Sequence, residues 1–208
     1  MITRYEAGNY IEELKRYAIG HGRAEDTWYT YHNHVYGAAE LARRIAERVE
    51  GIDAERAYVL ALLHDIGYEK DDREKRFHGL VGYNFMKDKD EGVARICLTH
   101  TFLWNRLEPY DEIAWKFFDK KEDYDFVKSY VESRDSDDYD LLVQLVDCLV
   151  NKDGFVTLEQ RATEYFERRG VKISQEHMNK VLRLKTYFDD KLGFDLYDLF
   201  LLPFVNPL

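Results

Sequence analysis

Apolar residues along most of the chain recur every three or four positions, which is the spacing of a helix that buries one face. Glycines separate the periodic segments. We therefore predict an all-α fold with helices at 7–19, 31–50, 53–66, 78–88, 91–102, 111–119, 123–133, 138–151, 157–169, 174–191 and 195–200. In the acidic stretch before 138–151, Ser136 or Asp137 is expected to cap that helix, because either side chain can accept bonds from unpaired amides.

Several of these helices carry a titratable residue on their apolar stripe. His34 lies one turn before Ala38 on the stripe of 31–50, and Asp147 shares a stripe with Val143 and Val150. An unpaired carboxylate aimed at a core is costly. The same periodicity turns three further histidines inward, with an aspartate directly after the first of them: His64, Asp65, His78 and His100.

A bound divalent metal is one explanation for these inward-facing groups. Neutral imidazoles and ionised carboxylates are common ligands, and the ion offsets the buried charge. The alternative is structural, since a single histidine on an apolar stripe is more often a hydrogen-bonded core residue. His177 lies on such a stripe without neighbouring ligand types and is expected to be structural. Periodicity alone leaves both explanations open.

Composition narrows the classes of function. A chain of 208 residues suffices for a single domain with a substantial core. The net charge of -10 argues against binding to nucleic acid polymers or to anionic membranes. No signal-type segment or membrane-length apolar window is seen, which favours a cytoplasmic protein. Cys97 and Cys148 lie in apolar segments and are predicted to be buried free thiols.

The order His34, then His64-Asp65 within "LLHDIG", then Asp147, together with the "AAELA" that follows His34, resembles the HD superfamily of metal-dependent phosphohydrolases. The phrases "GYNFM" and "ARICLTHTF" are similar to a bacterial group of stand-alone HD proteins. The resemblance implies a helical HD-type core at about 28–151, followed by packing helices at about 152–208.

The resemblance also implies a ligand set. His34, His64, Asp65 and Asp147 would hold one divalent ion, while His78 and His100 match branches that hold a second ion bridged by Asp65. His32 competes with His34 as the first ligand. Asp65 and His64 would be the catalytic residues, with Asp65 orienting the attacking water. Manganese, iron, cobalt, nickel, zinc and magnesium are all candidate ions.

Two departures from the family pattern affect substrate binding. The lysine that often follows the doublet is replaced by Tyr68, and the Gly-Tyr-Pro signature of the cyclic dinucleotide branch is absent, so cyclic di-GMP is disfavoured. Basic residues elsewhere could contact a phosphate, although solvated surface is the alternative role for each. The main candidates are Arg23, Lys70, Arg73 and Arg95, with Lys75 and Arg76 as further options.

The resemblance implies hydrolysis of a phosphate ester or anhydride, of a nucleotide or another small phosphorylated metabolite, by a metal-activated water. Two alternatives remain open. The same ligands could hold two irons that activate oxygen, or the domain could bind a nucleotide or a partner without catalysis. The apolar tail "LFLLPFVNPL" is expected to cap the core or to join a homodimer.

Overall fold

The computed structural model describes residues 1–68, 77–105, 118, 120–170 and 172–201, and it confirms the all-α prediction. The helical elements are α1 (Arg4–Gly20), α2 (Glu25–Ala46), α3 (Ala54–Leu63), α4 (His78–Met86), α5 (Glu91–Thr99), η1 (Leu103–Asn105), α7 (Lys121–Glu132), α8 (Asp138–Cys148), α9 (Leu158–Arg169), α10 (Gln175–Leu192) and η3 (Leu196–Leu201). One hairpin pairs β1 (Val150–Asn151) with β2 (Gly154–Phe155). The helix predicted at 111–119 lies outside the described residues except for Phe118.

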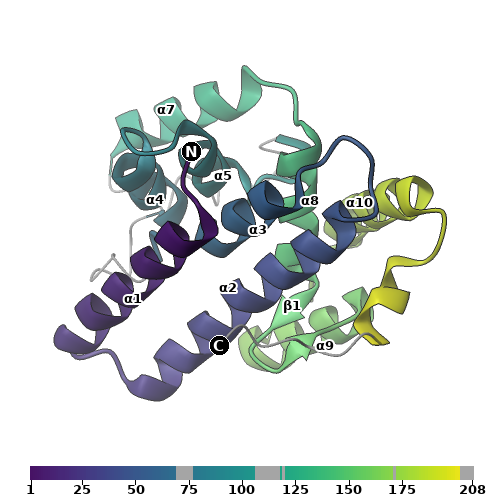
Figure 1. Cartoon of the computed structure of the whole chain (residues 1–208), viewed down its shortest axis with the longest axis horizontal. Coiled ribbons are helices and arrows are strands. Elements are labelled where there is room, and N and C mark those ends of the chain that lie inside the picture. Colours follow the sequence, from purple (N-terminus) through teal and green to yellow (C-terminus); the bar gives the residue numbers. More distant parts are fainter. Residues whose placement is uncertain (69–76, 106–117, 119, 171, 202–208) are drawn as a thin grey trace.

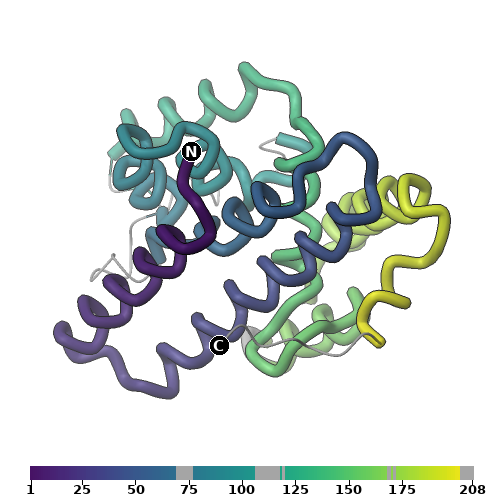
Figure 2. The backbone as a smooth tube through the Cα atoms, viewed as in Figure 1, coloured from purple at the N-terminus to yellow at the C-terminus, as the bar shows by residue number. Residues whose placement is uncertain are grey.

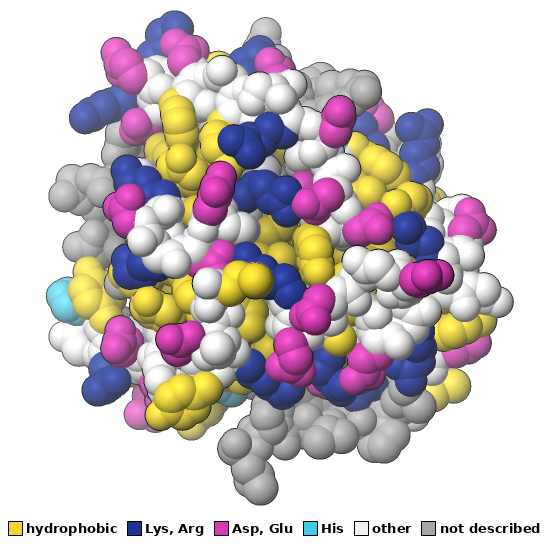
Figure 3. All heavy atoms as spheres, turned by 45° about the horizontal axis from the view of Figure 1, so that its top comes forward, with side chains coloured by type: hydrophobic (Ala, Val, Ile, Leu, Met, Phe, Trp, Pro, Cys, Tyr) yellow, Lys and Arg dark blue, Asp and Glu magenta, His cyan; other side chains and the backbone are white. Residues whose placement is uncertain are grey.

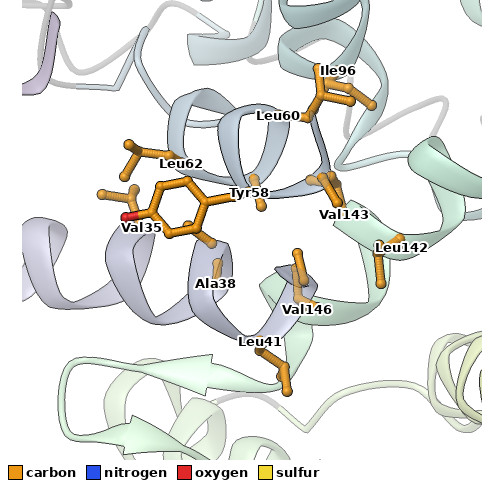
Figure 4. Packing of buried hydrophobic residues seen from close by; sticks show 14 of the residues in the cluster. Val35, Ala38, Leu41, Tyr58, Leu60, Leu62, Ile96, Leu142, Val143 and Val146 are labelled. Carbon is orange, nitrogen blue, oxygen red and sulfur yellow. The ribbon is translucent and has the colours of Figure 1, made fainter. Parts of the chain in front are cut away.

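The centre of the molecule is formed by α2, α3 and α8, which pack on one another, and α5 packs against α3 and α8 (Figures 1 and 2). Figure 4 shows apolar side chains from these helices meeting, among them Ala38, Tyr58 and Val146. All three are at most 2% exposed. A smaller apolar cluster around Leu98 and Val127 joins α5 to α7.

Two predicted boundaries were wrong for physical reasons. The second helix begins at Glu25 rather than at residue 31, because Trp28 and Tyr31 are buried and extend its apolar face by more than a turn. The helix predicted at 138–151 ends at Cys148, because the next residues pair in the hairpin. The predicted cap is confirmed for Asp137, whose carboxylate accepts bonds from the first amides of α8.

An ion pair fastens the amino-terminal segment to the helical core. The carboxylate of Asp90 caps α5 through the Val93 amide, accepts a bond from the Ile2 amide at 2.8 Å, and pairs with the Arg56 guanidinium at 2.6 Å. Burial alone would raise the pKa of Asp90, but these donors outweigh it and lower the pKa to about 2.

This lowered pKa predicts an acid-dependent loss of stability. An unfolded aspartate has a pKa of about 3.9, so ionised Asp90 adds stability above that pH, and the contribution disappears as pH falls towards 2. We expect Asp90→Asn to lower the free energy of unfolding by ~2 kcal/mol at pH 7, and much less near pH 2. Urea unfolding of the wild type and of Asp90→Asn between pH 2 and pH 7 tests this prediction. A difference that does not change with pH would contradict the assignment.

The surface carries both signs of charge. On the face in Figure 3, acidic and basic side chains are interspersed, and neither sign gathers into one large patch. Among the described helices, none combines the length and the apolar character needed to cross a bilayer.

Candidate metal centre

Six of the predicted ligand side chains meet where several helices end. His34 lies in the middle of α2, His64 and Asp65 directly follow α3, and His78 opens α4. The remaining two are His100, which follows α5, and Asp147, in the last turn of α8. Residues that are far apart in the chain therefore share one site.

The six donors form two groups. In the first, His34 Nε2 lies 3.1 Å from an oxygen of Asp147, and His64 Nε2 lies 3.8 Å from the same oxygen. One ligand atom from each of these three residues falls within 4.8 Å of the others, which is close enough to surround a single ion. One oxygen of Asp65 also borders this group, because Oδ2 lies 3.6 Å from His64 Nε2 and 4.0 Å from His34 Nε2.

The second group lies around Asp65, and it borders the first through His64, because ligand atoms of His64, Asp65 and His100 also fall within 4.8 Å of one another. The Oδ1 of Asp65 is 3.1 Å from His78 Nε2 and 3.2 Å from His100 Nε2, and these two nitrogens are 3.1 Å apart. Two imidazole lone pairs this close repel each other unless a proton or a cation lies between them. The carboxylate of Asp65 thus faces one group with each oxygen.

Three of the histidines are oriented by the backbone. The Nδ1 atoms of His34 and His64 lie 3.1 Å and 2.6 Å from the carbonyl oxygens of Val150 and Ala61. The Nδ1 of His100 lies 2.9 Å from the Cys97 carbonyl. Because a carbonyl only accepts, each Nδ1 carries a proton, and each ring in its neutral form presents the Nε2 lone pair to the cluster.

The arrangement fits a metal ion better than a closed hydrogen-bond network. His64 Nε2 and Asp65 Oδ1 are buried and have no hydrogen-bond partner, although other ligand atoms stand close by. Buried polar groups are normally hydrogen-bonded, so two unpaired polar atoms in one cluster require another explanation. A divalent cation would satisfy both at once. The side chains of His78 and Asp147 are each 26% exposed, so solvent reaches the cluster at these two residues.

Both carboxylates of the cluster are held ionised. Burial would raise the pKa of Asp147, but the neighbouring imidazoles of His34 and His64 hold that pKa well below its usual range. Burial would likewise raise the pKa of the half-buried Asp65, but the neighbouring His64 and His78 hold that pKa well below its usual range. Burial disfavours charge on His64, yet the two carboxylates outweigh it and raise its pKa to about 9. The cluster therefore attracts positive charge, which is the condition for binding a cation.

Glycines permit the close approach of the elements that carry the second group. A Cβ added at Gly67 would lie 2.0 Å from the backbone oxygen of His78 and 2.4 Å from the Gly82 nitrogen. A Cβ at Gly79 would lie 2.6 Å from the Cys97 oxygen. We call Gly67, Gly79 and Gly82 the glycine seam. It lets the chain after α3, helix α4 and helix α5 pack with their backbones nearly in contact.

A fourth glycine has the same effect for the first group. A Cβ at Gly37 would lie 2.5 Å from a methyl carbon of Val150, so glycine lets the hairpin pack this closely on α2 without a shift of Val150. The Val150 carbonyl then reaches the His34 ring. Sequence reasoning missed the hairpin and this role of Gly37. The run "NKDGF", which contains a turn-forming pair, was the available signal.

The structure distinguishes between His34 and His32, the two candidates for the first ligand. His34 points into the cluster, whereas the ring of His32 lies 4.4 Å from the Tyr36 ring and 6.3 Å from Trp28. His177 lies on α10, where burial lowers its pKa and the charge of Asp147 acts in the opposite direction.

The described structure does not bring the candidate phosphate-binding residues together at the cluster. The guanidinium of Arg95 pairs with Asp137 at 2.7 Å and lies 3.6 Å from Asp140, so its charge is already compensated. Arg23 lies in the turn between α1 and α2. The other four, Lys70, Arg73, Lys75 and Arg76, lie outside the described residues. Tyr68, which replaces the lysine, is half exposed, with its ring 5.9 Å from that of His78.

Comparison with known proteins adds one finding. A family model described as an HD domain matches residues 31–152, which is more than half of the chain and contains all six clustered residues. Neither the curated proteins nor the solved structures gave a match.

Proposed function

Because the chain belongs to the HD-domain family, whose members are mostly metal-dependent phosphohydrolases, we propose that it hydrolyses a phosphate ester or anhydride. The substrate would be a nucleotide or another small phosphorylated metabolite. The observation that carries this proposal is the convergence of four imidazoles and two ionised carboxylates, with orphaned donor atoms on His64 and Asp65. This donor set suits one or two divalent ions, among manganese, iron, cobalt, nickel, zinc and magnesium.

Each residue has a distinct role in this proposal. His34, His64 and Asp147 would hold one ion, His78 and His100 would hold the second, and Asp65 would contribute an oxygen to each. A bound divalent ion supplies a water of lowered pKa and compensates the charge of the phosphate. Asp65 would also orient that water by accepting its hydrogen bond. His64, with a side chain that is 0% exposed, closes the inner side of the site to bulk solvent.

The histidine pair on α2 provides a matched test of the first group. We expect His34→Ala to weaken binding of the first ion by at least about 100-fold, because a direct ligand should matter more than the outer-shell partners whose loss costs 10- to 100-fold. His32→Ala should change metal affinity little, since its ring packs on Tyr36 instead. Metal titration by isothermal calorimetry measures both. Equal losses in the two variants would refute the assignment of His34.

The decisive experiment combines metal analysis with a substrate panel. Chelated protein is reloaded with each candidate ion, its metal content is measured, and release of phosphate is followed on nucleotides, dinucleoside polyphosphates and sugar phosphates. Metal-dependent hydrolysis that a chelator abolishes supports the proposal. Bound iron with a mixed-valence signal and no hydrolysis would instead indicate an oxygenase. Failure to bind any ion would point to a non-catalytic binding module.

A further inference from the structure

A cavity of about 320 Å³ lies between α4 and the start of α7. Its apolar wall is formed by Phe77, Leu80, Val81 and Phe118. The positions 77, 80, 81 and 84 recur at helical spacing, so the cavity follows one face of α4 for two turns. Its volume is at the lower end of the range seen for small-molecule sites.

The cavity is linked to the candidate metal centre through Phe77. Phe77 immediately precedes His78, and the centroids of their two rings are 5.4 Å apart. The ring of Phe77 is also 5.2 Å from Phe118 and 5.5 Å from Phe102. One aromatic side chain thus contacts a candidate metal ligand and lines the cavity. The lining includes none of the six candidate ligands, so Phe77 is the residue through which a ligand in the cavity would neighbour His78.

Polar side chains stand around the aromatic wall. Asn84 and Lys120 line the cavity and are exposed, and Asp123 lines it while half-buried. A carboxamide and a carboxylate can pair with the hydrogen-bonding edge of a heterocycle, and phenyl side chains such as Phe77 and Phe118 can pack against its flat face. A sugar without a base has no planar surface to use this wall.

Building on the proposed function, we propose that this cavity binds the planar base of a nucleoside phosphate while the phosphate lies at the metal centre. The substrate class is therefore nucleotides rather than sugar phosphates. Stacking of a base on an aromatic side chain contributes about 1–3 kcal/mol, so loss of one ring should weaken binding by roughly 5- to 150-fold. Phe118 is the ring to remove, because it has no contact with the metal-ligand histidines in the described structure.

The first test uses nucleosides, which have no phosphate, and metal-free protein, so that it does not depend on catalysis. Isothermal calorimetry is expected to detect binding of at least one of adenosine, guanosine, cytidine and uridine to the wild type. Phe118→Ala should weaken that binding, and Asn84→Trp, at an exposed position, should fill the cavity and block it. Lys87→Ala, at the residue that follows α4 and outside the cavity lining, is the control. No nucleoside binding, or binding equal in all variants, would overturn the proposal.

The second test compares a nucleoside 5′-monophosphate with ribose 5-phosphate, the same molecule without its base. The wild type should prefer the nucleotide in kcat/KM by at least about tenfold, and Phe118→Ala should reduce that preference mainly through KM. Equal use of both substrates would overturn the base site while leaving the phosphohydrolase proposal intact. Hydrolysis of neither, with nucleoside binding retained, would overturn the proposed function and leave the base site standing. Circular dichroism establishes that each variant is folded.

Discussion

Replacing Asp65 with asparagine is expected to reduce phosphate hydrolysis on the order of a thousand-fold, because metal ions contribute several kcal/mol to such reactions and each 1.36 kcal/mol is a factor of ten. The reason is the position of this carboxylate between the two donor groups. Its Oδ1 lies 3.1 Å and 3.2 Å from His78 and His100, and its Oδ2 faces His64 and His34. Asparagine keeps the shape but loses the charge and one of the two acceptor oxygens.

Metal content and rate must be measured together in Asp65→Asn. We expect fewer ions per chain than in the wild type, with unchanged helicity by circular dichroism. Asp153→Asn serves as the control, because its side chain is 71% exposed in the hairpin turn. If Asp65→Asn kept its metal and most of its activity, the proposed bridging role of this carboxylate would be wrong.

Gly67→Ala is expected to lower the free energy of unfolding by about 3 kcal/mol, the upper end of the usual cost of overpacking. The added Cβ would lie 2.0 Å from a backbone oxygen and 2.4 Å from a backbone nitrogen of α4, and neither atom can turn aside as a side chain can. For a chain of this size, the change corresponds to a fall in Tm of roughly 10 °C. Because one clashing atom belongs to His78, this candidate ligand should also move away from Asp65 and His100.

Gly8→Ala provides the matched comparison. Gly8 lies within α1, and a Cβ there would meet nothing within 4 Å, so the substitution should stabilise the protein by ~0.5–1 kcal/mol through helix propensity. Thermal unfolding monitored by circular dichroism ranks the two variants, and calorimetric metal titration tests the second donor group. If Gly67→Ala had the Tm of the wild type and bound as many ions, the backbones at the glycine seam would be able to move apart at little cost.

Periodicity predicted much of this architecture, because a helix that buries one face must repeat its apolar positions. The same rule identified the inward-facing residues: the stripe that contains Ala38 and Ile45 fixed the direction of His34, and the stripe of Val143 and Val146 fixed that of Asp147. The structure places both side chains in one cluster. That His34 and Asp147 bind a metal ion remains a prediction.

Features that depend on contacts between distant segments could not be predicted in this way. A Cβ added at position 67 would clash with α4. A Cβ added at position 37 would clash with Val150, which is more than a hundred residues away. The two-residue strands of the hairpin are too short to show alternation. The cavity beside Phe77 exists only when α4 and the start of α7 come together. Such features arise from tertiary packing and leave no periodic trace in the sequence.

The backbone acceptors of the histidine protons have a consequence for how this centre can evolve. In many metal sites the group that orients an imidazole is a neighbouring carboxylate, which a single codon change can remove. Here the acceptors for His34, His64 and His100 are carbonyls of Val150, Ala61 and Cys97, and every amino acid supplies a carbonyl. Substitution at these three positions leaves the acceptor in place as long as the backbone path is kept. The orientation of the rings is thus inherited with the fold, and new chemistry at this centre would have to come from exchanging the ligands themselves or the surrounding pocket.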